Sequence, residues 1–344
     1  MTPDLDAPAT DRKTDDSPRG VRRVVVHAAS RLHFGLFAWG GAGRQFGGVG
    51  VMVRQPGLSL CAEQASAATF EGPLASRIAE FCGRWADYRG LARPPALRWR
   101  VSEAPPEHVG LGTGTQLGLA VAAALFRLCG ERTTTPQELA LSVGRGLRSA
   151  IGAYGFSLGG LIVEPGKLAG EDLSPLGRRT SIPDAWRFVL VRPAIACGLH
   201  GPAERQGFAA LPPVPIDVTQ RLVDLATLRL APAAERGDFT EFSSATYHYG
   251  ILAGGCFTPV QGGPFNGAIL ASLVERIRAL GVIGVGQSSW GPTLFAVLPD
   301  EANARQFARD LVAQTEVPLD ITITAADNAG ARIEVRGSEP ANSP

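Results

Sequence analysis

Apolar positions follow two periods along the chain, and each period predicts a different kind of element. Short β-branched runs such as VRRVVVH at residues 21–27 predict strands, because alternate side chains point to opposite faces. Apolar residues spaced by three and four positions, as in Ile78, Phe81, Cys82 and Trp85, predict the buried face of a helix. Further strands are expected at 57–61, 97–101, 161–166, 186–191, 293–298 and 321–326, and helices at 73–85, 113–128, 135–146, 218–237, 239–255, 267–280 and 301–314.

The order of these elements predicts an α+β protein with two folded units. Residues 169–183 are rich in Gly, Pro, Ser and Arg and lack a period, which is typical of a boundary. We therefore expect a first domain at 21–183 and a second at 184–336. Residues 1–20 and 337–344 are expected to be disordered tails, since the first of them is acidic and rich in Pro, Ser and Thr.

The stretch PPEHVGLGTGTQ, which runs directly into an apolar helix, is the most informative local pattern. Glycines at 110, 112 and 114 permit close approach, and Thr113 or Thr115 could cap the helix or bind an oxyanion. The first amides of a helix lack internal partners and favour anions, phosphate above all. A glycine turn that only lets the helix pack tightly is an equal alternative.

A second pattern is a hairpin broken by glycines at residues 28–53, where Arg31 and His33 share one face of a strand. Together they could hold an anionic ligand, or they could form a solvated edge. Arg145 and Arg148, among glycines, are candidates for a phosphate or carboxylate clamp, with exposed helix-end arginines as the alternative.

A third pattern is GVGQSSWGP at residues 284–292. Small hydroxyls with free amides can form an anion nest, and Trp290 offers a flat wall for an aromatic ring. A turn without function is the weaker alternative.

Composition narrows the classes of function. The net charge of +1 gives no reason to expect a nucleic-acid or membrane partner, and there is no GKS or GKT motif for a P-loop. The five cysteines are scattered without a CxxC pair, which argues against structural zinc and a disulfide framework. The first 20 residues lack the apolar core of a signal peptide, and no apolar run is long enough to span a bilayer. We expect a cytoplasmic protein.

Five ordered motifs give the chain a resemblance to a known family. SRLHFGLF, FGGVGVMV, GLGTGTQLGLAVA, GRGLRSAIGAYGFSLGG and GQSSWGPT resemble the β-ribofuranosylaminobenzene 5'-phosphate synthase branch of the GHMP kinase superfamily, over roughly residues 24–335. This resemblance implies a GHMP-kinase-like two-domain fold, with an N-terminal domain like ribosomal protein S5 domain 2 and a ferredoxin-like α/β-sandwich C-terminal domain.

The resemblance also implies a reaction. Phosphoribosyl pyrophosphate would condense with 4-aminobenzoate or 4-hydroxybenzoate, releasing carbon dioxide and pyrophosphate, in tetrahydromethanopterin biosynthesis and with Mg²⁺ as cofactor. An ATP-dependent small-molecule kinase of the same superfamily is the alternative. It is weakened because Gly114 stands where such kinases usually carry a second serine, and because SAIGAYGFSLGG contains no carboxylate. A homodimer is expected by analogy alone.

On this interpretation the site residues fall into four groups. The pyrophosphate is expected on Gly110, Leu111, Gly112, Thr113, Gly114, Thr115, Gln116 and Arg145. The substrates are expected against Arg31, His33, Gln287 and Trp290. Arg148, Ser288 and Ser289 are the candidate catalytic residues, and Glu204 is the candidate metal ligand.

Overall fold

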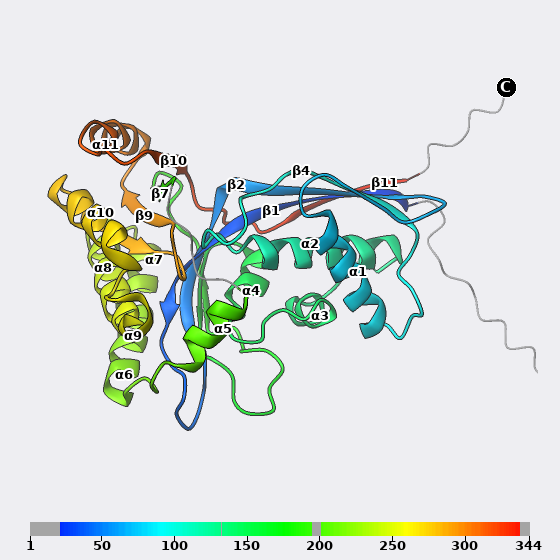
Figure 1. Ribbon diagram of the computed structural model, residues 1–344, viewed down its shortest axis with the longest axis horizontal. Coiled ribbons are helices and arrows are strands. Elements are labelled where there is room, and N and C mark those ends of the chain that lie inside the picture. Colours follow the sequence, from blue (N-terminus) through cyan, green and yellow to red (C-terminus); the bar gives the residue numbers. More distant parts are fainter. Residues whose placement is uncertain (1–20, 132, 195–200, 338–344) are drawn as a thin grey trace, which may run out of the picture.

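The computed structural model describes residues 21–131, 133–194 and 201–337, which form two sheets with helices packed on them (Figure 1). The first sheet has seven strands: β1 (Val21–Leu36), β2 (Gly48–Gln64), β3 (Thr69–Glu71), β4 (Leu97–Glu103), β5 (Leu161–Glu164), β6 (Arg178–Thr180) and β11 (Arg332–Gly337). The second has four strands in the order β10 (Leu319–Thr324), β7 (Arg187–Pro193), β9 (Leu294–Leu298) and β8 (Val285–Gln287).

Four helices cover one face of the first sheet (Figure 1). They are α1 (Ala75–Tyr88), α2 (Thr113–Leu128), α3 (Pro136–Ser142) and α4 (Ile151–Leu158). Helix α2 is central, with twelve of its residues buried, and the predicted stripe Ile78, Phe81, Cys82 and Trp85 of α1 packs into the same core. The predicted helix start at Thr135 is confirmed, because its Oγ1 accepts the Glu138 amide in a capping box.

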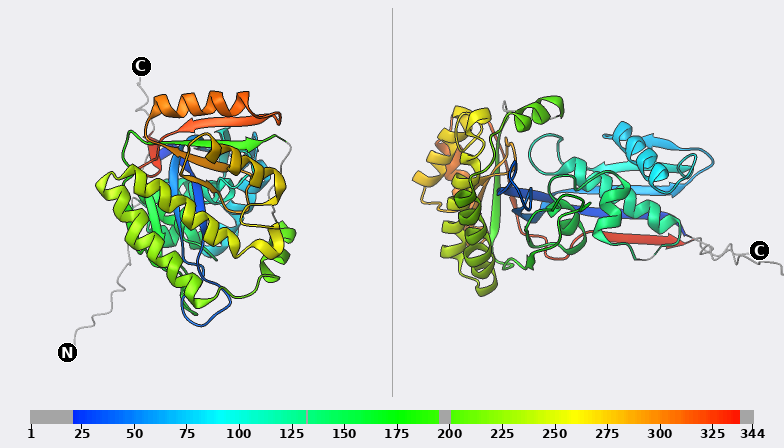
Figure 2. Two further views of the ribbon diagram at one scale, coloured as in Figure 1. Left: turned by 90° about the vertical axis from the view of Figure 1, so that its left-hand side faces the viewer. Right: turned by 90° about the horizontal axis from the view of Figure 1, so that it is seen from below.

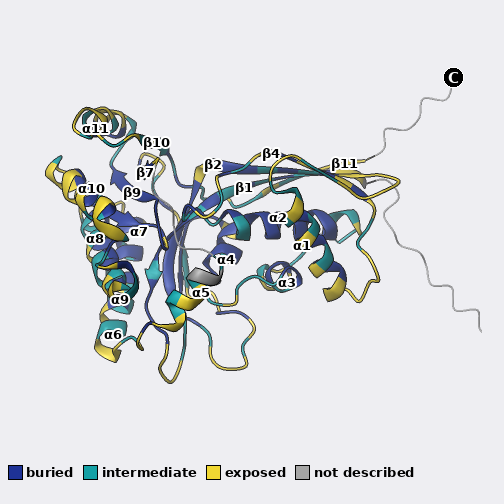
Figure 3. Ribbon diagram, in the orientation of Figure 1, coloured by how far each residue is buried: buried dark blue, intermediate teal, exposed yellow. Residues whose placement is uncertain are grey.

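Most of the remaining helices form one layer against the second sheet, whereas α5 lies apart from that layer (Figures 1 and 2). They are α5 (Gly201–Ala209), α6 (Ile216–Asp224), α7 (Ala231–Arg236), α8 (Phe239–Gly255), α9 (Thr258–Gln261), α10 (Gly267–Ala279) and α11 (Glu301–Ala313), with a π-helical turn at Leu225–Leu230. Asp238 caps α8, since its Oδ1 accepts the Glu241 amide. Figure 3 shows that the faces between layers are buried.

The hairpin of β1 and β2 joins the two units. Both strands are long, and β1 pairs with β2 with register shifts after Ala28 and after His33. A Cβ at Gly50 would lie 2.6 Å from the Leu32 carbonyl oxygen, so close packing of the backbone requires glycine there. The two strands of the hairpin therefore lie closer together at Gly50 than a residue with a Cβ would allow.

Three sequence-based expectations differ from the structure. Residues 201–209, where the sequence pattern predicts no element, form helix α5, and the expected boundary at 169–183 contains strand β6. Strand β11 pairs antiparallel with β1, so residues 332–337 belong to the first sheet rather than with the second unit. The hydrophobic pattern predicted no strand after residues 321–326. Nothing in it indicated that the chain goes back to the first sheet.

Parts of the other expectations fall outside the described residues. The supposed tails at 1–20 and 337–344 lie there except for Gly337, which ends β11, and so does Cys197. The division into two domains therefore stays a prediction. Within the described ranges, Cys61, Cys82, Cys129 and Cys256 are free thiols, and no helix is long and apolar enough to cross a bilayer.

Candidate active site

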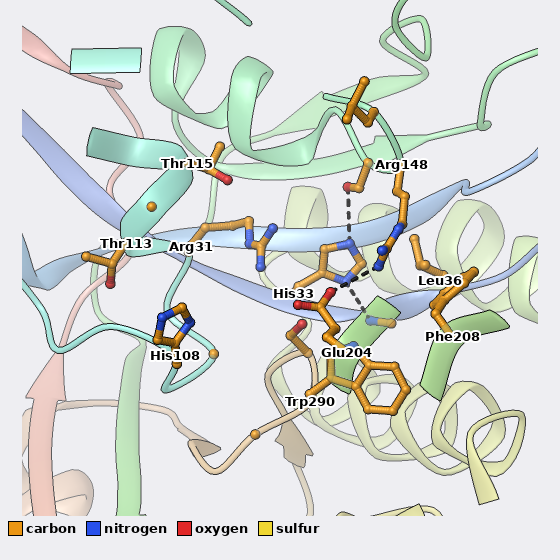
Figure 4. Close-up of a pocket in the computed structure, with 18 of the residues that line it drawn as sticks. Arg31, His33, Leu36, His108, Thr113, Thr115, Arg148, Glu204, Phe208 and Trp290 are labelled. Carbon is orange, nitrogen blue, oxygen red and sulfur yellow. Dashed lines mark hydrogen bonds and ion pairs between the residues drawn. The ribbon is translucent and has the colours of Figure 1, made fainter. Parts of the chain in front are cut away.

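A cavity of about 640 Å³ opens between the two units. Its walls come from β1, the loop before α2, the segment before α4, helix α5, helix α8 and the turn after β8 (Figure 4). Of the residues expected at the site, the cavity is lined by Arg31, His33, Gly110, Gly112, Thr113, Gly114, Thr115, Arg145, Arg148, Glu204, Gln287, Ser289 and Trp290. Segments far apart in the sequence therefore meet here.

The glycine loop is tied directly to β1. Gly112 has φ 73° and its Cβ position would lie 3.2 Å from Arg31 Cβ, so the loop backbone packs against that arginine. The Arg31 amide donates to the Leu111 carbonyl at 3.0 Å. This contact places the start of α2 beside the Arg31 side chain.

The expected threonine cap of α2 is wrong. Helix α2 has Gly112 at its N-cap and no side-chain cap, and the Thr113 hydroxyl donates instead to the Pro106 carbonyl at 2.9 Å. The amides of Thr115 and Gln116 bond back to the Gly112 carbonyl. The first two amides of the helix, at Thr113 and Gly114, thus remain at the cavity wall.

Three expected residues do not line the cavity. Ser288 is fully buried, where its hydroxyl donates to the Gly110 carbonyl (2.6 Å) and accepts the His33 amide (3.0 Å). Gln116 is buried and donates to the Gly152 carbonyl, and Leu111 is a core residue. Ser288 therefore holds the loop to β1, which corrects the expectation that it acts in catalysis.

Arginines of the cavity differ in how well their nitrogens are paired. Arg31 Nε and Arg145 Nε are buried without a hydrogen-bond partner. Burial lowers the pKa of Arg31 to about 10, opposed by the charges of Glu164 and Glu204, so the group stays protonated at neutral pH. Burial, followed by repulsion from Arg77 and Arg84, lowers the pKa of Arg145 to about 10. Such desolvated cations favour an anionic ligand.

We name two faces of the cavity. The amide–arginine wall consists of Gly110, Gly112, Thr113, Gly114, Thr115, Arg31, Arg77 and Arg145. The aromatic wall consists of Leu36, Phe208, Phe257 and Trp290. In Figure 4, Thr113, Thr115 and Arg31 lie to one side, and Leu36 and Phe208 lie to the other.

The aromatic wall is packed and its neighbouring charges are paired. Trp290 meets Phe257 edge to face, with ring centroids 4.9 Å apart. The Arg148 guanidinium lies 4.6 Å from the Phe208 ring centroid and donates to Glu204 at 3.0 Å. Ser289 adopts a left-handed φ of 56°, and its amide donates to the His33 carbonyl, which fixes the turn beside Trp290.

The expected metal ligand is already engaged. Glu204 forms an ion pair with Arg148, and the described part of the chain contains no group of three or more His, Cys, Asp or Glu side chains arranged for a metal ion. Mg²⁺ is held through few carboxylates only when substrate phosphates supply other ligands. These residues do not fit a resident metal ion.

Sequence reasoning missed a buried carboxylate next to this cavity. Glu164 ends β5 with no exposed surface, and it accepts the Ser149 hydroxyl (2.5 Å) and the Ala150 amide (2.8 Å). Burial raises its pKa to about 7, against these hydrogen bonds. A single acidic residue in the apolar strand LIVE was the available signal, because such residues are rarely buried without a partner.

Arg77 and Arg84 were also missed. They lie on α1, approach the ring of Phe81, and line the cavity beside Arg145. Arg77 pairs with Glu107, and Arg84 pairs with Glu80. Their helical spacing resembles that of any solvated helix face, so only the fold reveals their position.

Comparisons with known proteins agree with this architecture. Residues 230–316 match the family described as GHMP kinases C terminal. The chain is 30% identical over 335 residues to the beta-ribofuranosylphenol 5'-phosphate synthase of Archaeoglobus fulgidus, covering 90% of this chain and 99% of that protein. It is 28% identical to the protein of the same name from Methanothermobacter thermautotrophicus, covering 90% and 98%.

A solved structure supports the fold alone. Mevalonate pyrophosphate decarboxylase from Streptococcus pyogenes superposes with a TM-score of 0.65 at 11% identity, covering 90% of this chain and 98% of that one. The expected GHMP-kinase-like fold is thereby confirmed. The chain is an enzyme of the pentosyltransferase type and belongs to the beta-ribofuranosylphenol 5'-phosphate synthase family, a branch of the GHMP kinase superfamily.

Proposed function

We propose that the enzyme joins phosphoribosyl pyrophosphate to a benzoate that carries a hydroxyl or amino group at its para position, releasing carbon dioxide and pyrophosphate. The observation that carries this proposal is the pairing of two unlike walls in one cavity. One wall offers amides and incompletely paired arginines to phosphates, and the other offers aromatic rings to a flat acceptor. The names of the curated relatives describe a ribofuranosylphenol product, which fits a hydroxybenzoate acceptor in those proteins.

The pyrophosphate would bind the amide–arginine wall. The amides of Thr113 and Gly114 point out from the start of α2, where a helix favours negative charge. Arg145 lies beside Arg77 on the same wall. These donors would stabilise the charge that develops on the leaving group.

The acceptor would lie along the aromatic wall. Trp290 and Phe257 would hold the ring by apolar contact, and Arg31 would receive its carboxylate. Holding the ring behind the ribose C1 atom favours a single displacement with inversion. Apolar packing of Leu36 and Trp290 would limit the entry of water, which would otherwise capture the sugar cation.

The steps balance without another reactant. The bond from C1 to the pyrophosphate oxygen breaks, and its electron pair leaves on that oxygen. The ring carbon that bears the carboxylate bonds to C1. The bond to the carboxylate carbon then breaks, its pair restores the aromatic ring, and carbon dioxide departs.

Magnesium belongs to the substrate in this proposal. Because the described residues do not fit a resident metal ion, Mg²⁺ would arrive bound to the pyrophosphate group, as it commonly does with phosphate substrates. A cytoplasmic location, a homodimer and a role in tetrahydromethanopterin biosynthesis stay predictions.

The test is to supply phosphoribosyl pyrophosphate, Mg²⁺ and carboxyl-labelled 4-hydroxybenzoate or 4-aminobenzoate, and to count the released carbon dioxide. Release that depends on all three components supports the proposal. No release with either acceptor, together with ATP-dependent phosphorylation of a sugar or polyol, would establish the kinase alternative instead.

A further inference from the structure

A chain of three hydrogen-bonded polar groups, the partly exposed Ser149 and the buried His33 and Glu164, leads from the cavity into the protein beneath it. Ser149 and His33 line the cavity, whereas Glu164 lies behind them. His33 Nε2 and Ser149 Oγ are 3.1 Å apart, and Ser149 Oγ and Glu164 Oε1 are 2.5 Å apart. Figure 4 shows the bond from the His33 ring to the neighbouring hydroxyl.

The direction of the hydrogen bonds in this chain is fixed. The Gly35 amide donates to His33 Nδ1 at 3.1 Å, so the imidazole proton is on Nε2 and is donated to Ser149. The Ser149 proton is then donated to Glu164. Gly35 itself is held in place, because its carbonyl accepts the Tyr249 hydroxyl at 2.9 Å and a Cβ at this position would lie 2.6 Å from Ala253 Cβ.

This chain has a simpler role as well. Glu164 accepts the Ala150 amide and so satisfies the start of α4, which has no cap of its own. The side-chain carbonyl of a glutamine would accept the Ala150 amide equally well. The role as a cap therefore does not explain why a fully buried carboxylate receives a serine hydroxyl at the cavity wall.

We propose that Ser149 and Glu164 form a proton relay that accepts the para-hydroxyl proton of a 4-hydroxybenzoate, with His33 as the positioning residue; this rests on the proposed function. Arg31 and His33 lie two residues apart on one face of β1, and both line the cavity together with Ser149. A benzoate whose carboxylate pairs with Arg31 and whose ring lies in the cavity would bring its para hydroxyl to the His33–Ser149 pair.

The proton steps balance. The acceptor hydroxyl gives its proton to Ser149 Oγ as Ser149 gives its own to Glu164 Oε1. The electron pair left on the phenol oxygen activates the ring carbon that attacks C1. Loss of carbon dioxide returns that pair to the oxygen as phenolate, which then recovers the proton through Ser149.

Ser149 has room for this exchange. Besides His33, its oxygen accepts the Ile151 amide in a long bond of 3.3 Å, and that amide also faces Glu164. A substrate hydroxyl can displace this weak contact. A pKa near 7 suits Glu164 to accept a proton at neutral pH and to return it.

The charged and titratable groups around Glu164 come from three other elements. Arg31 and His33 face it from β1, Tyr154 from α4 and Tyr249 from α8. Burial and the charge of Arg31 lower the pKa of His33, and burial raises that of both tyrosines. Glu164 is therefore the group in this set that titrates near neutral pH.

The experiment compares two acceptors, because only one of them must lose a proton. The nitrogen lone pair of 4-aminobenzoate already activates its ring, whereas 4-hydroxybenzoate needs the relay. Glu164→Gln is expected to lower kcat for 4-hydroxybenzoate by at least about 100-fold and to leave most of the rate with 4-aminobenzoate. In the unmodified enzyme, kcat for 4-hydroxybenzoate should fall as the pH drops through about 7, and Glu164→Gln should lose this dependence.

Further variants control for folding. Ser149→Ala should show the same selective loss, and Ser149→Thr, which keeps a hydroxyl, should recover much of the rate. Equal losses with both acceptors would mean a purely structural role and would overturn the relay. Turnover of 4-aminobenzoate alone by the unmodified enzyme would also overturn it while leaving the proposed function intact, and no turnover of either acceptor would overturn both.

Discussion

The arginines at the two walls of the cavity differ in whether every buried nitrogen has a partner. On the amide–arginine wall, Arg31 and Arg145 each keep a buried nitrogen without a partner. Beside the aromatic wall, Arg148 is satisfied by Glu204 and lies over the Phe208 ring. Because an unsatisfied buried donor is costly, the first wall is built for an anion that comes from outside, and the second already contains its own counter-charge.

The largest effect should come from adding a negative charge to the amide–arginine wall. A Cβ at Gly114 would lie 2.7 Å from Arg77 Nη2, the end of a long side chain that must shift equally for Gly114→Asp and for Gly114→Ala. Its carboxylate would oppose the pyrophosphate by about 4 kcal/mol, or about 1,000-fold in kcat/KM for phosphoribosyl pyrophosphate. Gly114→Ala is the matched control and should retain most activity, while thermal unfolding should show that both variants are folded. An unchanged rate in Gly114→Asp would contradict the placement of the pyrophosphate.

Removing the charge of Arg31 should have the next largest effect. Arg31→Met keeps the apolar stem against Gly112 but loses the guanidinium, which costs about 1.5–3 kcal/mol for hydrogen bonds to a charged group. We expect kcat/KM for the benzoate to fall by about 10- to 100-fold. Arg31→Lys should recover part of this loss, because lysine restores the positive charge but not the two parallel N–H donors of a guanidinium. If Arg31→Met binds both substrates normally, Arg31 is a structural residue of β1.

A smaller effect is expected on the aromatic wall. Trp290→Phe keeps an apolar ring but weakens the contact with Phe257, which is worth about 0.5–1.5 kcal/mol. The KM for the benzoate should rise up to about tenfold, while the KM for phosphoribosyl pyrophosphate stays constant. Equal changes in both constants would mean that the two substrates are not divided between the walls.

The smallest effect concerns Glu204. Glu204→Gln removes the negative charge beside Arg148, and an ion pair as exposed as this one contributes only about 0–1 kcal/mol to stability. Because this carboxylate is paired with an arginine, the Mg²⁺ concentration that gives half-maximal activity should stay the same. A marked rise in that concentration would restore Glu204 as a metal ligand.

Sequence patterns predicted the elements better than the contacts between them. The spacing of Ile78, Phe81, Cys82 and Trp85 was enough to place the buried face of α1, and the capping box at Thr135 was readable from three positions. The glycine loop could be recognised as a close approach but not as a contact with Arg31. Helix α5 was missed, because its composition resembles a polar loop.

Long-range hydrogen bonds explain the remaining failures. Ser288 read as a free hydroxyl in a glycine-rich turn, yet its partners are 178 and 255 residues away in the chain. Glu164 bonds a hydroxyl that lies 15 residues before it, on the far side of α4. No short-range sequence pattern predicts such hydrogen bonds, because they depend on how the sheets and helices pack together.

The pairing of β11 with β1 has a consequence for the order in which the protein is made. Strand β1 leaves the ribosome well before β11, with the whole second sheet between them in the chain, so the β1 edge of the first sheet stays unpaired until β11 has been made. An open strand edge can pair with other chains, so the nascent protein is exposed to misassociation during most of its synthesis. Closing the first sheet requires the chain to pass through the second, so the first sheet is completed only after every strand of the second has been made.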